Sequence, residues 1–120
     1  MPLDCLHIVF MSLVLNKLCY CLPAWGGFVR ETDVCRINSL FRRAKRCGFT
    51  HPIFDFQGLC HHYDTTLFDK MRNESHCLSH LMPTQRTNCK SLRVVKSFEI
   101  PKCRTELYKN SFVPRILYRI

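Results

Sequence analysis

The sequence lacks the patterns that identify most small enzymes and metal-binding modules. It has no CxxC pair, the strongest indication of a zinc ribbon or a thioredoxin-like redox site. It also has no glycine-rich phosphate loop and no carboxylate cluster of the kind that holds Mg²⁺. Its apolar N-terminal run, "LHIVFMSLVL", is shorter than the roughly 20 residues of a membrane span. We therefore expect no catalysis, cofactor or membrane partner for this chain.

Acidic residues are also scarce. Lys and Arg number 18 against 9 acidic residues, a net charge of +9, and the surplus lies mostly toward the C-terminus. A positive field attracts polyanions, with nucleic acid as the first candidate. A solvated surface that only keeps the chain soluble is the alternative, because charge patterning alone discriminates poorly.

Cysteine is abundant, but its pattern is not that of a secreted disulfide framework. The nine cysteines are odd in number and scattered along the chain. The N-terminal apolar run also lacks the basic flank of a signal peptide. We expect mostly reduced thiols and a reducing compartment, the cytoplasm or nucleus. A secreted cysteine-rich protein is the less favoured alternative.

Cysteines and histidines gather in the middle of the sequence without the spacing of a metal site. His76 and His80 are four apart and could share a helical face as zinc ligands do. The other candidates are contiguous and do not fit a ligand motif, so packing and surface roles are favoured over metal binding. The set is Cys60, His61, His62, His76, Cys77 and His80.

Apolar periodicity predicts a mainly α, bundle-like fold in a single partial domain of 120 residues, with one short strand possible. The expected segments are a buried helix over 3–22 ended by Pro23, a basic amphipathic helix over 32–48, a helical segment over 56–82 and a basic C-terminal segment over 84–120. "SLRVVKSFEIP" has the composition of the short strand, and a helix is expected to break or start near Pro114.

The expected helix over 32–48 has the clearest two-sided pattern. Thr32 or Asp33 is placed to cap its start, and Gly48 suits the position just after its end. At 100° per residue the apolar side chains fall on one side and most of the basic ones opposite. The apolar set is Val34, Ile37, Leu40, Phe41 and Ala44, and the basic set is Arg36, Arg42, Arg43 and Arg46, with Lys45 at the border.

Four stretches, in this order, resemble the region after the polymerase core of non-LTR retrotransposon reverse transcriptases of the jockey-like or long-interspersed-element type. "LVLNKLCYCLPAWGG" resembles an apolar helix followed by a Pro-x-Trp turn, and "INSLFRRAKRCGFT" resembles the next basic helix. "LFDKMRNESHCLSHLMP" and "SLRVVKSFEIPKCRTELYKNSFVPRILYRI" resemble two distal motifs. Together the patterns cover about residues 3 to 120.

The resemblance implies a parent enzyme that synthesises DNA on an RNA template during transposition, with Mg²⁺ as its cofactor. Such polymerases hold two Mg²⁺ ions on an Asp-Asp turn, and no adjacent Asp pair occurs here, so no nucleotidyl transfer is expected from this chain. The resemblance also implies that the palm and fingers of the polymerase lie outside this chain. We expect the final stretch to be interrupted and the first helix to pack on the missing core, which predicts marginal stability of the chain alone.

The expected partners are RNA or an RNA–DNA hybrid, together with the polymerase core of the parent protein. A stand-alone basic nucleic-acid-binding protein is the main alternative. The candidate nucleic-acid-binding residues are Arg36, Arg42, Arg43, Arg46, Lys102, Arg104, Lys109 and Arg115.

Overall fold

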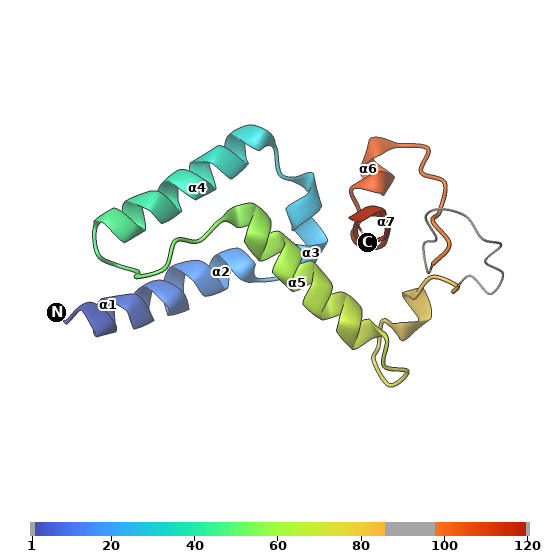
Figure 1. Cartoon of the computed structure of the whole chain (residues 1–120), viewed down its shortest axis with the longest axis horizontal. Coiled ribbons are helices and arrows are strands. Elements are labelled where there is room, and N and C mark those ends of the chain that lie inside the picture. The colour runs from blue at the N-terminus through green and yellow to red at the C-terminus, as the bar shows by residue number, and fades with distance from the viewer. Residues whose placement is uncertain (1, 86–97, 120) are drawn as a thin grey trace, which may run out of the picture. The chain divides into compact units, whose positions relative to one another are not determined.

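A computed structural model describes residues 2–85 and 98–119 of the chain. These residues are mainly helical and contain no strand, which confirms the predicted mainly α fold (Figure 1). Gln85 and Phe98 form an isolated antiparallel bridge. Most of the predicted short strand, residues 91–97, lies outside the described residues.

The helices are short except for two of 16 residues each, α4 and α5. In chain order the elements are α1 (Leu3–Phe10), the π-helical turn η1 (Met11–Leu15), α2 (Asn16–Cys19), α3 (Leu22–Trp25), the 3₁₀ turn η2 (Gly26–Phe28), α4 (Glu31–Arg46), α5 (Phe56–Met71), the 3₁₀ turn η3 (Ser79–Leu81), α6 (Glu106–Lys109) and α7 (Phe112–Arg119).

The chain divides into two compact units, unit 1 (Met1–Tyr63) and unit 2 (Asp64–Ile120). Helix α5 contributes its first half to unit 1 and its second half to unit 2. Each unit has its own apolar core among the described residues. The sequence predicts a single domain, and that the two units unfold together as one domain stays a prediction.

The helix predicted over 3–22 forms as a continuous helix over Leu3–Cys19, three residues shorter than predicted. It contains a π-helical turn at Met11–Leu15 that the sequence did not predict. The buried residues Phe10 and Leu15 are five apart, a spacing that a π turn brings to the same side of the helix. Pro23 does not end this helix. It lies in the first turn of α3, where its missing N–H leaves no helical hydrogen bond unmade.

One side of α1 and η1 is exposed, although the sequence predicts a buried helix, which is expected to pack on a core that this chain lacks. Ile8 is 63% and Leu13 60% exposed, and Val9 between them is also exposed. The opposite side carries Phe10 and Leu15 into the core of unit 1. The stretch is therefore apolar on both sides although only one side is covered within unit 1.

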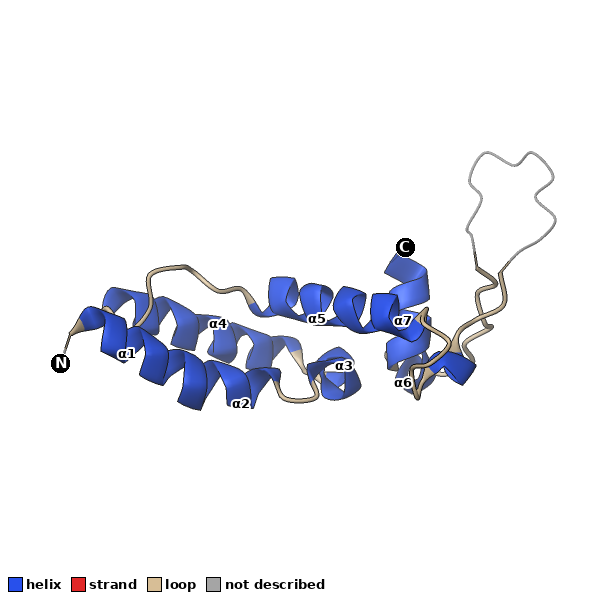
Figure 2. Ribbon diagram, turned by 90° about the horizontal axis from the view of Figure 1, so that it is seen from below, coloured by secondary structure: helices blue, strands red, loops and turns tan. Residues whose placement is uncertain are grey.

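The core of unit 1 joins the N-terminal helices to α4, which lies beside them, and to the start of α5 (Figure 2). Phe41 of α4 is completely buried, and the ring of Phe54 lies 5.8 Å from it and 6.4 Å from the ring of Phe10. The buried set is Phe10, Leu15, Cys19, Leu22, Val34, Phe41, Ala44, Phe56 and Cys60.

Helix α4 ends as the sequence predicts but starts without a side-chain cap. Arg30 holds the N-cap position, so the predicted caps at Thr32 and Asp33 lie inside the helix. At the other end Gly48 takes φ +80°, the left-handed conformation that glycine adopts without strain. The N–H of Gly48 donates to the carbonyl of Lys45 at 3.1 Å, and the N–H of Phe49 donates to the carbonyl of Ala44 at 3.0 Å. These two hydrogen bonds form a Schellman motif.

Two side chains fix the start of α5. The side chain of Asp55 accepts the N–H of Gly58 at 3.0 Å, as an N-cap does. Asn38 of α4 accepts the N–H of Phe56 at 2.9 Å and so ties the loop over 47–55 to α4. The α-helix ends at Met71, so the predicted helical segment over 56–82 is too long. Residues 72–78 form turns before η3.

Unit 2 packs the end of α5 against α7. Its core cluster consists of Phe68, Phe98, Ile116 and Leu117, with Met82, Phe112 and Val113 packed against it. Pro114 lies in the first turn of α7, where its missing N–H leaves no helical hydrogen bond unmade. The expectation that a helix starts near Pro114 is confirmed.

Candidate nucleic-acid interface

The exposed face of α4 brings together four of the predicted nucleic-acid-binding residues. Arg36, Arg42, Arg43 and Arg46 are all exposed, on the side opposite buried Val34, Phe41 and Ala44. We call these four arginines the α4 basic face. They sit within three turns of one regular helix, so their Cα atoms are held at fixed separations of up to about 15 Å by the helix rise of 1.5 Å per residue.

Among residues 2–85 and 98–119, few interactions hold these guanidinium groups in place. Arg36 lies 3.7 Å from Asp33 in a pair whose side chains are 84% and 49% exposed. Arg42 donates to the Ser39 hydroxyl at 3.0 Å, and that hydroxyl donates to the Cys35 carbonyl at 2.8 Å. Exposed pairs of this kind contribute little to stability, so these cations can turn to phosphate oxygens at little cost.

A shallow hollow on α4 follows the same face. Its volume is about 330 Å³, and it is lined by Cys35, Arg36, Ser39, Leu40 and Arg43. All five residues belong to one helix, so the hollow is a groove along its surface. Two guanidinium groups and a hydroxyl beside a short apolar floor suit a sugar–phosphate backbone.

Three further candidates form a second exposed basic region, within unit 2. Lys102 and Arg104 are exposed just before α6, and Lys109 is exposed at the end of α6. The Lys109 ammonium lies 5.4 Å from the centroid of the Tyr118 ring, a cation–π contact between α6 and α7. Thr105 caps α6 by accepting the N–H of Tyr108 at 3.2 Å.

The remaining candidate, Arg115, is not on the surface. Its side chain is only 9% exposed, and its guanidinium donates twice to Asp64, from Nη2 to Oδ1 at 2.8 Å and from Nε to Oδ2 at 3.1 Å. Nη1 donates to the Asn110 carbonyl at 2.8 Å. We therefore assign Arg115 to the interior of unit 2, since a phosphate contact would take from buried Asp64 both of the hydrogen bonds that Arg115 donates to it.

Asp64 is the residue whose role the sequence-based interpretation missed. It is 1% exposed on α5, and it also accepts from Arg119 Nη1 at 3.2 Å. One signal was present: Asp64 falls four residues after Cys60 and four before Phe68, on the buried stripe of α5. A carboxylate on an apolar stripe indicates a buried cationic partner, although the sequence does not say which one.

Cysteine thiols contribute to raised pKa values at two tyrosines. A hydrogen bond with the Cys19 thiol, and then burial, raise the pKa of Tyr63 above its ordinary value of 10.0. Desolvation, and then a hydrogen bond with the Cys103 thiol, raise the pKa of Tyr118 in the same direction. Both phenols are therefore neutral hydrogen-bonding groups near pH 7.

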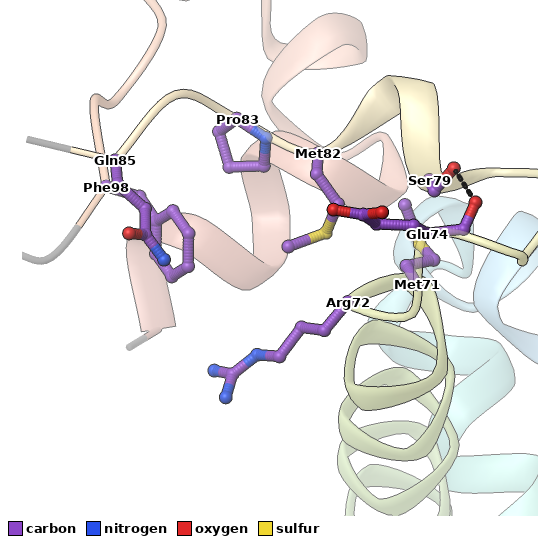
Figure 3. Close-up of a pocket in the computed structure, with 8 residues that line it drawn as sticks. All are labelled: Met71, Arg72, Glu74, Ser79, Met82, Pro83, Gln85 and Phe98. Carbon is purple, nitrogen blue, oxygen red and sulfur yellow. Dashed lines mark hydrogen bonds between the residues drawn. The ribbon is translucent and has the colours of Figure 1, made fainter.

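A pocket of about 530 Å³ lies in unit 2 (Figure 3). Its lining residues are Met71, Arg72, Glu74, Ser79, Met82, Pro83, Gln85 and Phe98. Arg72 extends away from Glu74, and its guanidinium lies 5.4 Å from the centroid of the Phe68 ring. The pocket's two charged groups therefore do not converge on one point, and we assign no chemistry to it.

The structure does not assemble the weak metal pattern of the sequence. Among residues 2–85 and 98–119 no three His, Cys, Asp or Glu side chains are grouped to hold a metal ion. Cys60 is buried in the core of unit 1. His76 and His80 do not share the helical face that their spacing would allow, because His76 lies in a turn, where its Nδ1 accepts the N–H of Leu78 at 3.2 Å.

The described cysteines are free thiols, with Cys19 and Cys60 buried and Cys5, Cys21, Cys35, Cys47 and Cys77 exposed. In the described part of the chain no single helix is long and apolar enough to cross a membrane. The helical pair Leu3–Cys19 and Leu22–Phe28, bent by 43°, meets the length and composition requirement only when both members are taken together.

Comparisons with protein-family models, curated proteins and solved structures found no match for this chain.

Proposed function

We propose that this chain is the thumb-side and downstream region of a non-LTR retrotransposon reverse transcriptase, in which the α4 basic face binds RNA or an RNA–DNA hybrid. The observation that carries the proposal is the exposure of Arg36, Arg42, Arg43 and Arg46 along one side of α4, opposite its buried side. Arginines that project in a row from a rigid helix can contact successive phosphates of a nucleic-acid backbone.

The four ordered stretches of the sequence support the same assignment. Two of them coincide with elements of unit 1: "LPAWGG" forms α3 and the start of η2, and "INSLFRRAKRCGFT" runs along α4 through its Gly48 end. In the parent protein, nucleotidyl transfer with Mg²⁺ belongs to the polymerase core. The role proposed for this chain is to hold the nucleic acid.

The partner of unit 1 in this proposal is the polymerase core itself. Ile8, Val9 and Leu13 expose apolar side chains along α1 and η1, and contiguous exposed apolar surface is typical of a protein contact. The proposed compartment is the reducing cytoplasm or nucleus, where free thiols persist.

Binding of a labelled RNA–DNA hybrid, followed by fluorescence anisotropy between 50 and 200 mM salt, tests the α4 basic face. Each phosphate contact that is lost lowers the slope of log K against log salt by about 0.9 for a duplex. Replacing Arg36, Arg42, Arg43 and Arg46 by Gln is therefore expected to weaken binding and to flatten this slope by about 3 to 4.

A charge-matched variant gives the control. Lys17, Arg30, Lys70 and Arg72 are exposed cations outside the α4 basic face, and replacing these four by Gln removes the same net charge. We expect this control to bind more tightly than the α4 variant. Equal losses of affinity in the two variants would show that the nucleic acid is attracted only by the net charge of the chain. Unchanged binding by the α4 variant would exclude the α4 basic face as the site.

A stand-alone nucleic-acid-binding protein is the second candidate, because the exposed arginines of α4 serve it equally well. Sequencing the full transcript and the flanking genomic DNA distinguishes the two candidates. A same-frame upstream region that carries an Asp-Asp turn supports the retrotransposon assignment. A bounded transcript with its own promoter and no such region supports the stand-alone protein.

A further inference from the structure

Unit 2 exposes aromatic rings on α6 and α7, the two helices that the contact of Lys109 with Tyr118 joins. Tyr108 is 47% and Tyr118 43% exposed, whereas Phe98 is buried and Phe112 packs against the core of the unit. The two tyrosines accompany Lys102, Arg104 and Lys109, and we call these five residues the tyrosine surface.

The tyrosine surface has a fixed framework. The Thr105 cap holds the N–H of Tyr108 at 3.2 Å, and the Ser111 hydroxyl donates to the Tyr108 carbonyl in the turn that leads to α7. Tyr118 follows Ile116 and Leu117, which anchor α7 in the core. The backbone that carries both rings is therefore held in place before any ligand arrives.

Lys109 connects the two tyrosine-bearing helices. It follows Tyr108 directly in α6, and its ammonium lies 5.4 Å from the centroid of the Tyr118 ring. An arriving base can replace the ammonium on the ring, and the freed cation can then pair with the neighbouring phosphate. Such an exchange retains a favourable partner for both the ring and the cation.

The α4 basic face has a different composition. The one aromatic residue between Arg36 and Arg46 is Phe41, which is completely buried, so α4 itself places no exposed ring among these arginines. Cations alone contact the backbone of a duplex, whose bases are stacked on one another and closed to side-chain rings. Cations with exposed rings suit unpaired bases.

We propose that the tyrosine surface of unit 2 binds single-stranded nucleic acid, with Tyr108 and Tyr118 stacking on unpaired bases and the neighbouring cations contacting phosphates. This goes beyond the proposed function of α4, since it assigns a second surface and a different form of nucleic acid. It does not depend on the α4 basic face and can hold if that proposal fails.

The test uses the full chain with Arg36, Arg42, Arg43 and Arg46 replaced by Gln, so that binding to α4 does not contribute. Fluorescein-labelled probes are a 12-nucleotide oligouridylate, an abasic strand with the same number of phosphates, and a 12-base-pair duplex. Anisotropy at low salt is expected to give tightest binding for the oligouridylate, because it alone offers unpaired bases.

Loss of a stacking ring weakens single-strand binding by roughly 5- to 150-fold per base. We expect losses of this size for Tyr108→Leu and Tyr118→Leu with the oligouridylate, and little change with the abasic strand. Tyr108→Phe and Tyr118→Phe keep the rings and are expected to keep the affinity. Tyr20→Leu removes a tyrosine of unit 1 that is 76% exposed and serves as the matched control.

Two outcomes would overturn the proposal: equal affinity for the abasic strand and the oligouridylate, or unchanged affinity after the Leu substitutions. Circular dichroism reports whether Tyr118→Leu, which also removes the hydrogen bond with Cys103, has lost helix. If it has, Tyr108→Leu decides the question alone, since the hydrogen bonds at Tyr108 come from its backbone. The α4 proposal is tested separately, by comparing duplex binding of the unsubstituted chain with that of the chain whose four α4 arginines are replaced by Gln.

Discussion

Asp64 and Arg115 form a two-pronged ion pair inside unit 2 although 51 positions separate them in the chain. Asp64 is 1% and the Arg115 side chain 9% exposed, so both charges are removed from water and each compensates the other. The pair joins α5 to α7 one turn before Phe68, which lies in the apolar core of the unit.

Asp64→Asn is expected to destabilise unit 2 by about 3–5 kcal/mol, because it leaves the Arg115 guanidinium buried without its counter-charge. Urea unfolding followed by circular dichroism, with hydrogen exchange to locate the loss, measures the effect. Asp69→Asn is the control on the same helix: its pair with Arg72 is long, at 3.9 Å, and exposed, so a change within about 0.5 kcal/mol is expected. Similar losses in the two variants would contradict a special role for Asp64.

Gly48→Ala is expected to destabilise unit 1 by about 1–2 kcal/mol, because an L-residue is strained at the φ of +80° that ends α4. Thermal unfolding provides the measurement. Gly58→Ala is the matched comparison, since Gly58 lies in α5 and its added Cβ would meet nothing closer than 3.7 Å. That variant is expected to gain up to about 1 kcal/mol. A gain in the Gly48 variant would rule out the left-handed C-cap.

Asn38→Ala is expected to cost about 1–3 kcal/mol, because it removes the acceptor for the N–H of Phe56, a residue that is 2% exposed. The loss should appear in urea unfolding and as faster hydrogen exchange at the start of α5. Asn16→Ala, at an exposed position of α2, is expected to change stability by no more than about 0.5 kcal/mol. An unchanged exchange rate at Phe56 would disprove the contact.

Thiol labelling is expected to proceed in two stages. The exposed thiols of Cys5, Cys21, Cys35, Cys47 and Cys77 should react quickly with a bulky maleimide, whereas buried Cys19 and Cys60 should react only after unfolding. Mass spectrometry before and after addition of guanidinium counts the labelled sites. Nine labelled cysteines in the unfolded chain would exclude a disulfide framework, and blocked thiols would support the secreted cysteine-rich alternative.

The α4 basic face could be predicted from the sequence because its signal is local. Alternation of apolar and basic residues at helical spacing sets which side of α4 is buried, and Gly48 marks where the helix ends. Arg36, Arg42, Arg43 and Arg46 are exposed as that pattern predicts.

The density of apolar residues in the N-terminal stretch predicted its structure less well than the periodicity of α4 did. The N-terminal stretch is apolar on all sides, so its pattern did not reveal the π turn at Met11–Leu15 or the exposed side that carries Ile8 and Leu13. A uniformly apolar helix has no face for a periodicity to detect.

The sequence by itself determined the helical character of the chain, the two sides of α4 and the glycine end of that helix, because each depends on residues a few positions apart. The tertiary structure alone decided that Arg115 belongs to the interior of unit 2 while Lys109 and Tyr118 stay at its surface. Arg115 and Lys109 are both cations of the C-terminal segment, and the sequence does not distinguish them. Arg115 is buried and Lys109 is exposed because burial of a charge requires a partner, here Asp64, which lies far away in the sequence and comes close only in the folded chain.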